Sequence, residues 1–441
     1  MRRHNPSTIA RLACCAGIAA AGAISQASAA PPQYNVLYQF PGGVHGIQPE
    51  AGVILGPAGS LFGTTDTDGV NGGGGGVVFQ LTAPAAGESG PWAQTILKRF
   101  PHSAGAQGAY PLGLLLAPSG TLYGVTLDGG GNSNASGTVF SLAPAPDSST
   151  WTFATLYRFR GGNDGDLASG SLIMDASGTL SGTTILGGSG LGQDGYGVAF
   201  SLTPPPSGES GWTETVLHRF KSSPDGATPA GTLLALGGHL YGVSTTGGTG
   251  VCSDTGCGTV FRLTQTENGW SETIIWQFQG GADGSGPTDR LIADAKGSLY
   301  GATTEGGLPG SNGVYETGTV FRLDPPATGK SQWTKTVLYE FQGDTDGQLP
   351  DGGLTFDTNG ALYGTTQFGG PNFHGIVYKL TPNAPGQPWT KTTLHSFPSR
   401  SDDGSYPTGP LTLDNSGNIY GTTWQGGRSN DGTVYRITQQ P

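Results

Sequence analysis

Cysteine, basic residues and long apolar runs are all scarce in this sequence, and each shortage excludes a class of protein. Four cysteines in 441 residues are too few for a disulfide-rich scaffold. Lysine and arginine number 20 against 31 acidic residues, and the formal net charge is −11. Binding to phosphate backbones by counterion release needs the opposite sign. We therefore expect neither nucleic acid nor an anionic membrane surface as a partner.

Apolar runs are short everywhere except near the N-terminus. The first eleven residues include Arg2, Arg3 and Arg11 and no acid, an apolar stretch follows over residues 12–24, and the small residues Ala27 and Ala29 come next. This order predicts a cleaved signal peptide over residues 1–29 and a secreted or periplasmic mature protein from residue 30. No later segment has the roughly 18 apolar residues that a membrane-spanning helix needs, so we expect no membrane span.

The remaining cysteines are Cys252 and Cys257, because Cys14 and Cys15 lie within the predicted signal peptide. In an oxidising compartment, the segment CSDTGC predicts a local disulfide that closes one loop.

Glycine, in contrast, is abundant, with 80 residues, and a repeated phrase explains where it is used. A sequence close to LYGTT occurs seven times at intervals of 57 to 63 residues. The copies are Leu61–Thr65, Leu122–Thr126, Leu180–Thr184, Leu240–Ser244, Leu299–Thr303, Leu362–Thr366 and Ile419–Thr423. Repeats of this length with short strand-like segments are typical of propellers and solenoids.

Each unit contains four strand-like segments. A short apolar run precedes the LYG segment, a glycine-rich loop leads to GTVFxL, and the fourth segment reads WTxTxLYxF. In the copy over residues 333–341, period-two alternation predicts one face made of Trp333, Val337, Tyr339 and Phe341.

The two ends of the chain decide between an open and a closed arrangement. The last unit stops after its third strand, at residues 432–437, and the missing fourth strand is present at residues 34–40. Pairing these two segments would complete the last unit, whereas an open solenoid gains nothing from such a split. We therefore predict an all-β protein with a single seven-bladed β-propeller over residues 30–441, built from four-stranded blades.

The phrase LYGTT…GG…GTVFxLTP…W resembles the hallmark of secreted bacterial proteins with the "GloVer" tandem repeat, which include choice-of-anchor proteins. The resemblance covers essentially the whole mature chain. It implies a propeller-like repeat and export, and it implies no activity.

Strand order divides the connections between two faces. One face carries DxxG turns, which are typical of structural hairpins; they begin at Asp175, Asp294, Asp357 and Asp414. The other face carries the longer, more variable loops, where recognition is usually built. A repeated acid follows the fourth strand there, at Asp164, Asp225, Asp283, Asp346 and Asp403.

These five aspartates have two interpretations. Asp-Gly pairs favour turns, and the repetition then reflects only the repeat itself. Alternatively, the acids form an electronegative rim that binds Ca²⁺ or sugar hydroxyls. Asp344, Asp346 and Asp351 space oxygen ligands as calcium loops do, although the closing Glu is missing. Trp424 opens a variable loop and is a candidate for stacking on a sugar ring.

Three functions remain open at this point. The first is a noncatalytic module, expected to be monomeric and to require no cofactor, that binds an extracellular glycan, peptide or surface partner. The second is a hydrolase or lyase acting on polysaccharide, in which acids such as Asp346 and Asp403 work with a metal. The third is a structural protein of the cell surface or matrix.

Overall fold

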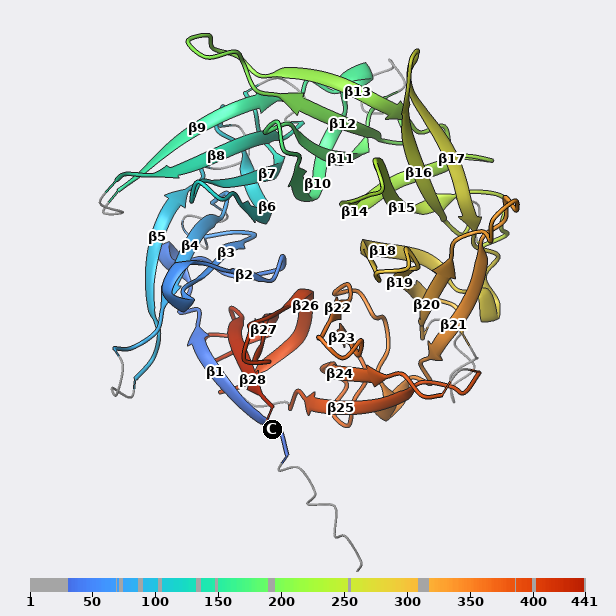
Figure 1. The fold of residues 1–441 in the computed structure, drawn as a ribbon. Coiled ribbons are helices and arrows are strands. Elements are labelled where there is room, and N and C mark those ends of the chain that lie inside the picture. Colours follow the sequence, from blue (N-terminus) through green and yellow to red (C-terminus); the bar gives the residue numbers. More distant parts are fainter. Residues whose placement is uncertain are drawn as a thin grey trace, which may run out of the picture.

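Seven four-stranded antiparallel sheets surround a central axis (Figure 1). The computed structural model describes residues 31–439 except 69, 71–73, 86–89, 102–104, 132–135, 147–149, 189–194, 253–254, 308–316, 385 and 399–401. The predicted signal peptide lies outside the described residues. The sevenfold propeller with four-stranded blades is confirmed.

Within each blade the strands follow one another from the centre outward. Blade 1 contains β2 (Val53–Leu55), β3 (Leu61–Thr65), β4 (Val77–Thr82) and β5 (Ala93–Arg99). Blade 2 contains β6 (Ala109–Leu116), β7 (Leu122–Asp128), β8 (Thr138–Pro144) and β9 (Trp151–Arg158). Blade 3 contains β10 (Asp166–Met174), β11 (Leu180–Leu186), β12 (Val198–Thr203) and β13 (Thr213–Arg219). Blade 4 contains β14 (Gly226–Leu236), β15 (His239–Gly247), β16 (Thr259–Thr266) and β17 (Gly269–Gln277).

The remaining blades follow the same pattern. Blade 5 contains β18 (Ser285–Ala293), β19 (Leu299–Glu305), β20 (Thr319–Asp324) and β21 (Thr334–Glu340). Blade 6 contains β22 (Thr355–Phe356), β23 (Leu362–Thr366), β24 (Ile376–Thr381) and β25 (Thr390–Ser396). Blade 7 contains β26 (Gly404–Leu413), β27 (Ile419–Gly426), β28 (Thr433–Thr438) and β1 (Gln33–Gln39). Short 3-10 helices occur at η1 (Gly43–His45), η2 (Pro57–Gly59), η3 (Gly162–Asp164), η5 (Gly281–Asp283) and η6 (Asp344–Asp346).

The ring closes through the two ends of the chain, as the sequence predicts. Strand β1 pairs antiparallel with β28, with Gln33 opposite Thr438 and Tyr38 opposite Val434. The first described strand is therefore the outer strand of the last blade. Propeller closure of this kind leaves no free edge between the first and last blades.

The glycine of each LYG segment makes room for the aromatic ring of the next strand. A Cβ atom added to Gly301 in β19 would lie 2.7 Å from Cζ of Phe321 in β20. The other LYG glycines meet a Phe or Tyr of the neighbouring strand in the same way. The repeated glycine is thus a consequence of core packing, since no side chain fits beside the ring.

A second repeated contact joins neighbouring blades. The glycine of GTVF lies against the proline that opens the next blade, so a Cβ added to Gly318 would lie 2.4 Å from Cδ of Pro350. The residue before that proline, Leu349, has a left-handed φ of 56°. This entry geometry decides which residues of the inner strand reach the central channel.

The outer strands depart from the predicted alternation. Val337 pairs with Phe321, whereas Tyr339 pairs with the adjacent Val320, because a β-bulge inserts Leu338 between them. Val337 and Tyr339 therefore point to opposite sides, and the prediction of a single face was wrong. A bulge adds an unpaired residue and increases the local twist, and Leu338 uses the extra position to enter the core, where it is 5% exposed.

The DxxG turns are structural, as predicted. In the turn of blade 7, Asp414 Oδ1 accepts hydrogen bonds of 2.9 Å from the backbone N–H groups of Ser416 and Asn418. These bonds lower the pKa of Asp414, although burial opposes them. The phenol of Tyr420 also donates to this carboxylate, at 3.0 Å.

The predicted disulfide is also present. Cys252 and Cys257 are bonded, and their Cα atoms lie 5.0 Å apart. Within the described part of the chain, no helix has the length and apolar character required to cross a membrane.

Candidate functional site

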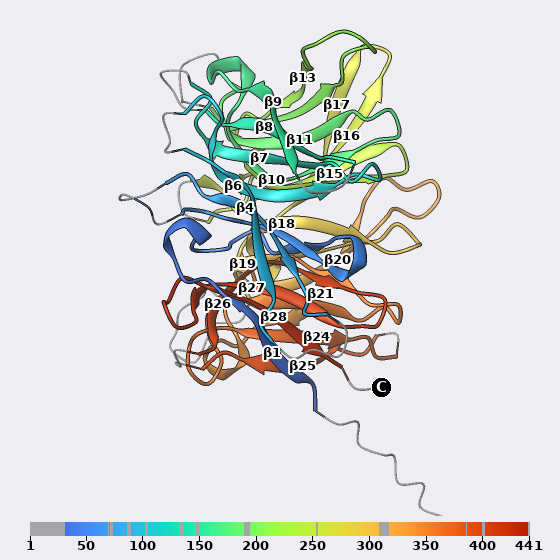
Figure 2. The same cartoon turned by 90° about the vertical axis from the view of Figure 1, so that its left-hand side faces the viewer.

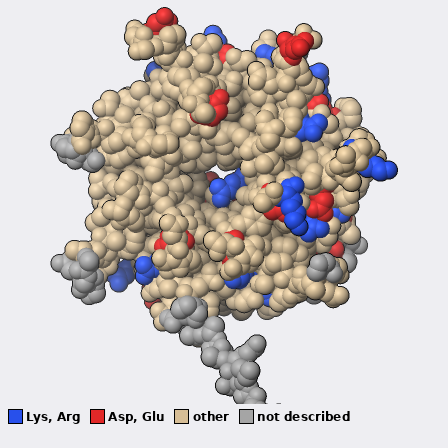
Figure 3. All heavy atoms as spheres, viewed as in Figure 1, with Lys and Arg blue, Asp and Glu red and all other residues tan. Residues whose placement is uncertain are grey.

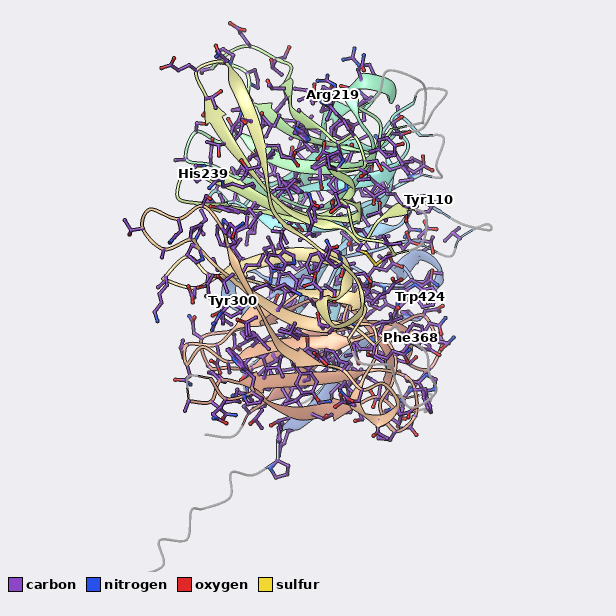
Figure 4. The ribbon with its side chains drawn as sticks, turned by 90° about the vertical axis from the view of Figure 1, so that its right-hand side faces the viewer. Tyr110, Arg219, His239, Tyr300, Phe368 and Trp424 are labelled. Atoms are coloured by element: carbon purple, nitrogen blue, oxygen red, sulfur yellow. A yellow bond between two sulfur atoms is a disulfide. The ribbon has the colours of Figure 1, made fainter. Side chains whose placement is uncertain are left out.

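The two faces of the propeller differ in their connections (Figure 2). We call the face with the second-to-third and fourth-to-first strand connections the loop face, and the opposite one the turn face. Figure 4 shows Tyr110, Phe368 and Trp424 on one side of the molecule, the loop face, and His239 and Tyr300 on the other.

A small cavity in the central channel contains the clearest cluster of polar side chains. Its volume is about 280 Å³, and its lining includes three carboxylates, Glu50, Asp289 and Asp351. We call these three residues the acidic mouth. They come from blades 1, 5 and 6: Glu50 and Asp351 precede the inner strands β2 and β22, whereas Asp289 lies within β18.

The repeat explains why these residues reach the channel. Glu50 and Asp351 directly follow the entry prolines Pro49 and Pro350, and Asp289 lies two residues after Pro287. In the other blades, leucine, serine, alanine or threonine follows the equivalent position. The frame is therefore constant, while the side chain that it directs into the channel varies from blade to blade.

Burial makes the charged form of these carboxylates unfavourable. It is the main cause that raises the pKa of Glu50 to about 7, with added repulsion from Asp66 and Asp351. Burial also raises the pKa of Asp289 to about 6, despite the nearby Arg290, and raises that of Asp351. A cluster of carboxylates with raised pKa values in a cavity is typical of a functional site.

Asp289 is the most constrained of the three. Its backbone has a left-handed φ of 57°, which is uncommon for a residue other than glycine. Its Oδ2 atom is buried and makes no hydrogen bond within the described residues. An unpaired buried carboxylate oxygen costs stability, and such costs are found where function maintains them.

The channel changes character toward the turn face. A second cavity of about 380 Å³ is lined by apolar residues such as Ile54 and Leu115 together with Arg290. Arg290 Nη2 donates to Thr355 Oγ1 at 3.2 Å. In Figure 3, basic atoms are visible at the central opening. One end of the channel is thus acidic, and the other is apolar with a basic group.

The five aspartates predicted as a rim lie at separate junctions between blades rather than around one cavity. Each carboxylate accepts a backbone N–H bond in its own loop. Examples are the bond from Arg160 to Asp164 at 2.7 Å and the bond from Gly404 to Asp403 at 2.6 Å. Most also contact an outer-strand side chain, as Asp346 does with Tyr339 at 2.8 Å. Their role as ligand-binding residues stays a prediction.

The structure does not bring together the predicted calcium ligands. Asp346 pairs with Lys391 at 2.6 Å at the junction of blades 5 and 6, while Asp351 lines the channel cavity. Asp344 is the first residue of η6, in the loop between β21 and β22. Among the described residues, these three carboxylates therefore do not surround one common point at which a Ca²⁺ ion could bind.

Trp424 lies at the end of β27, half-buried, and its indole N–H is buried without a hydrogen-bond partner among the described residues. In the repeat, Trp424 occupies the position that Gln367 has in the preceding unit, and Gln367 lines the cavity of the acidic mouth. The adjacent Phe368 is 37% exposed and lies 5.3 Å from Tyr406, measured between ring centroids.

Two members of the acidic mouth, Glu50 and Asp289, escape a search for linear motifs. The available signal was the variable residue one position after the repeated proline for Glu50 and two positions after it for Asp289, which becomes visible only when the units are aligned on that proline. Asp351 was a candidate, but as a calcium ligand.

Fold and site together define a closed seven-bladed propeller with a polar cavity in its channel. The sequence matches the Gloeobacter/Verrucomicrobia repeat over residues 15–193, 189–329 and 253–441. The chain belongs to this repeat family. No curated protein matches the sequence.

Several solved structures are similar to this chain. Extracellular domains of two hybrid two-component systems from B. thetaiotaomicron match 93% and 94% of this chain, with TM-scores of 0.50 and 0.52 and identities of 12% and 11%. The match spans only 41% and 43% of those two chains. A calcium structure of a carbohydrate-active enzyme of family AA12 from Trichoderma reesei has a TM-score of 0.42 and 14% identity, with 93% of this chain and 96% of that chain covered. At these identities, the two similarities to the extracellular domains show the fold alone.

Proposed function

We propose that this protein is an exported, noncatalytic binding module, and that its acidic mouth binds one polar unit of an extracellular glycan. The observation that carries the proposal is the convergence of Glu50, Asp289 and Asp351 on one cavity at the centre of the loop face. Carboxylates accept hydrogen bonds from hydroxyl or amine donors, and glycans present such donors in number.

The size of the cavity limits what can enter it. A volume of about 280 Å³ lies just below the roughly 300–1,000 Å³ range of small-molecule sites. The mouth therefore suits a single terminal unit, while the rest of a longer glycan would lie over the loop face. The exposed ring of Phe368 and the half-buried ring of its neighbour Tyr406 offer apolar surfaces for stacking there.

A glycan array with the purified protein tests the proposal. The informative variant combines Glu50→Gln with Asp351→Asn, which removes two charges and keeps the shape of both side chains. Glu267→Gln is a matched control, since Glu267 is exposed in the β16–β17 hairpin on the turn face. We expect the double variant to lose at least about tenfold in affinity, which corresponds to about 1.4 kcal/mol, and the control to bind like the wild type.

Two results would contradict the proposal. Absence of binding to every glycan on the array would remove its basis, as would equal binding by the double variant and the wild type. Release of new reducing ends from a bound polysaccharide would favour the hydrolase alternative instead, with Glu50 as a general acid.

A further inference from the structure

A set of three side chains recurs where each blade meets the next. It consists of an outer-strand residue, the loop residue that follows it, and an outer-strand residue of the next blade. Between blades 4 and 5, Asp283 accepts a bond from Trp276 Nε1 at 3.3 Å and pairs with Lys335 at 2.8 Å. The lysine neutralises the loop acid, and Lys391 does the same for Asp346 between blades 5 and 6.

The junction of blades 3 and 4 breaks this rule, because it places a second acid where those junctions have lysine. Its members are His218 of β13, Asp225 of the following loop and Glu272 of β17. His218 Nε2 lies 3.1 Å from Asp225 Oδ2 and 3.6 Å from Glu272 Oε2. All three side chains are largely buried, with exposures of 17%, 12% and 12%.

Two further observations show that Glu272 is incompletely paired at this junction. The Oε1 atom of Glu272 is buried and has no hydrogen-bond partner among the described residues. Burial and the adjacent Asp225 raise the pKa of Glu272 well above its ordinary value. Two carboxylates in contact at a largely buried place require either a shared proton or a cation between them.

The spacing of the three groups fits a metal ion. Ligand atoms of a tetrahedral Zn²⁺ site lie about 3.3 Å apart, given Zn–N and Zn–O bonds of about 2.0–2.1 Å, and the two measured separations bracket this value. One ligand atom from each residue lies within 4.8 Å of the other two, and within the described residues no other set of three His, Cys, Asp or Glu side chains meets that criterion. Backbone N–H groups of Lys221 and Gly226 hold the Asp225 carboxylate in place, at 3.2 and 2.7 Å.

We propose that His218, Asp225 and Glu272 bind one divalent transition-metal ion of the Zn²⁺ class, which joins the outer strands of blades 3 and 4. Imidazole with two carboxylates is a donor set for such ions, whereas Ca²⁺ prefers six or more oxygen ligands. The open fourth position would hold water.

The test uses the purified protein, stripped with a chelator and titrated with Zn²⁺ by calorimetry. We expect one Zn²⁺ per chain, a higher unfolding midpoint with Zn²⁺ than without, and at least about tenfold weaker binding in Glu272→Gln. This variant removes a repelling charge, so it should fold without metal. Co²⁺ in the wild type should give the visible absorption of a four-coordinate site, and Glu272→Gln should abolish it.

The chain supplies a matched control one blade earlier. Glu214 occupies the position of Glu272 beside Asp164, but there the loop acid accepts a 2.5 Å bond from Tyr157 instead of contacting a histidine. Glu214→Gln should therefore bind Zn²⁺ like the wild type. Less than one Zn²⁺ per chain, equal binding by Glu272→Gln, an equal loss in Glu214→Gln, or tighter binding of Ca²⁺ than of Zn²⁺ would each overturn the proposal.

Discussion

Replacing Asp289 by asparagine should stabilise the protein in a pH-dependent way. Asparagine has nearly the same shape as aspartate and tolerates the left-handed φ of 57° at this position. The substitution removes a negative charge that burial disfavours more strongly than the nearby Arg290 favours it, since the pKa of Asp289 is raised to about 6. The fold therefore favours the protonated carboxyl and disfavours the carboxylate.

The sign and size of the effect follow from linkage. The pKa of Asp289 is about 6 in the folded protein, compared with 3.8 for the unperturbed group. Between these values the folded state holds more protons than the unfolded state, so the wild type loses stability as pH rises through this window. This increase of about two in the pKa corresponds to a destabilisation of the wild type by at most about 3 kcal/mol, which is fully present above about pH 6. Below about pH 4 the contribution disappears.

Urea denaturation of both proteins at about pH 4 and about pH 8 measures this effect. The variant should gain up to about 3 kcal/mol relative to the wild type between the two conditions. Any pH-independent cost of burying the amide cancels in this difference. A change below about 0.5 kcal/mol, the usual size for an unimportant surface position, would show that the Asp289 carboxylate is solvated and that our description of the acidic mouth is wrong.

Three other predictions test the frame and the site. Gly301→Ala should destabilise the fold by about 1–3 kcal/mol through overpacking, while Gly90→Ala, with open space around it, should be neutral by thermal denaturation. Lys335→Met should lower the free energy of unfolding by about 3 kcal/mol in chemical denaturation, because Lys335 is only 3% exposed and its loss leaves the Asp283 carboxylate without an ion-pair partner. Equal stability of variant and wild type would contradict this. Glycan affinity should rise from about pH 6 to about pH 8, because burial raises the pKa of Glu50 to about 7 and only the carboxylate is a full acceptor. This rise should be absent in Glu50→Gln.

Much of the frame is readable from the sequence because it depends on local rules. Core packing explains the repeated LYG glycine, turn geometry explains the DxxG turns, and ring closure explains the displaced fourth strand. The pairing of β1 with β28 confirms the prediction about the fourth strand. The single face predicted for the outer strand failed because a bulge at Leu338 adds one residue. Periodicity cannot detect such an insertion while the spacing within the repeat stays constant.

The acidic mouth was harder to predict because it depends on geometry across blades. Glu50 and Asp289 are far apart in the sequence, and neither belongs to a motif. They meet because left-handed residues before the inner strands, such as Gln48 with a φ of 60°, set the direction of the chain at each entry. Aligning the repeat units shows which positions are constant, whereas the carboxylates of this cavity occupy positions that differ between the units.

The pairing of β1 with β28 also determines how the protein can be attached to anything else. Gln33 lies opposite Thr438, so both ends of the described chain leave from the turn face (Figure 2). A linker, bead or fusion partner joined to either end of the described part would therefore start on the side away from the acidic mouth. Immobilised protein should keep the loop face accessible, and binding experiments can use terminal tags without obstructing the cavity under test.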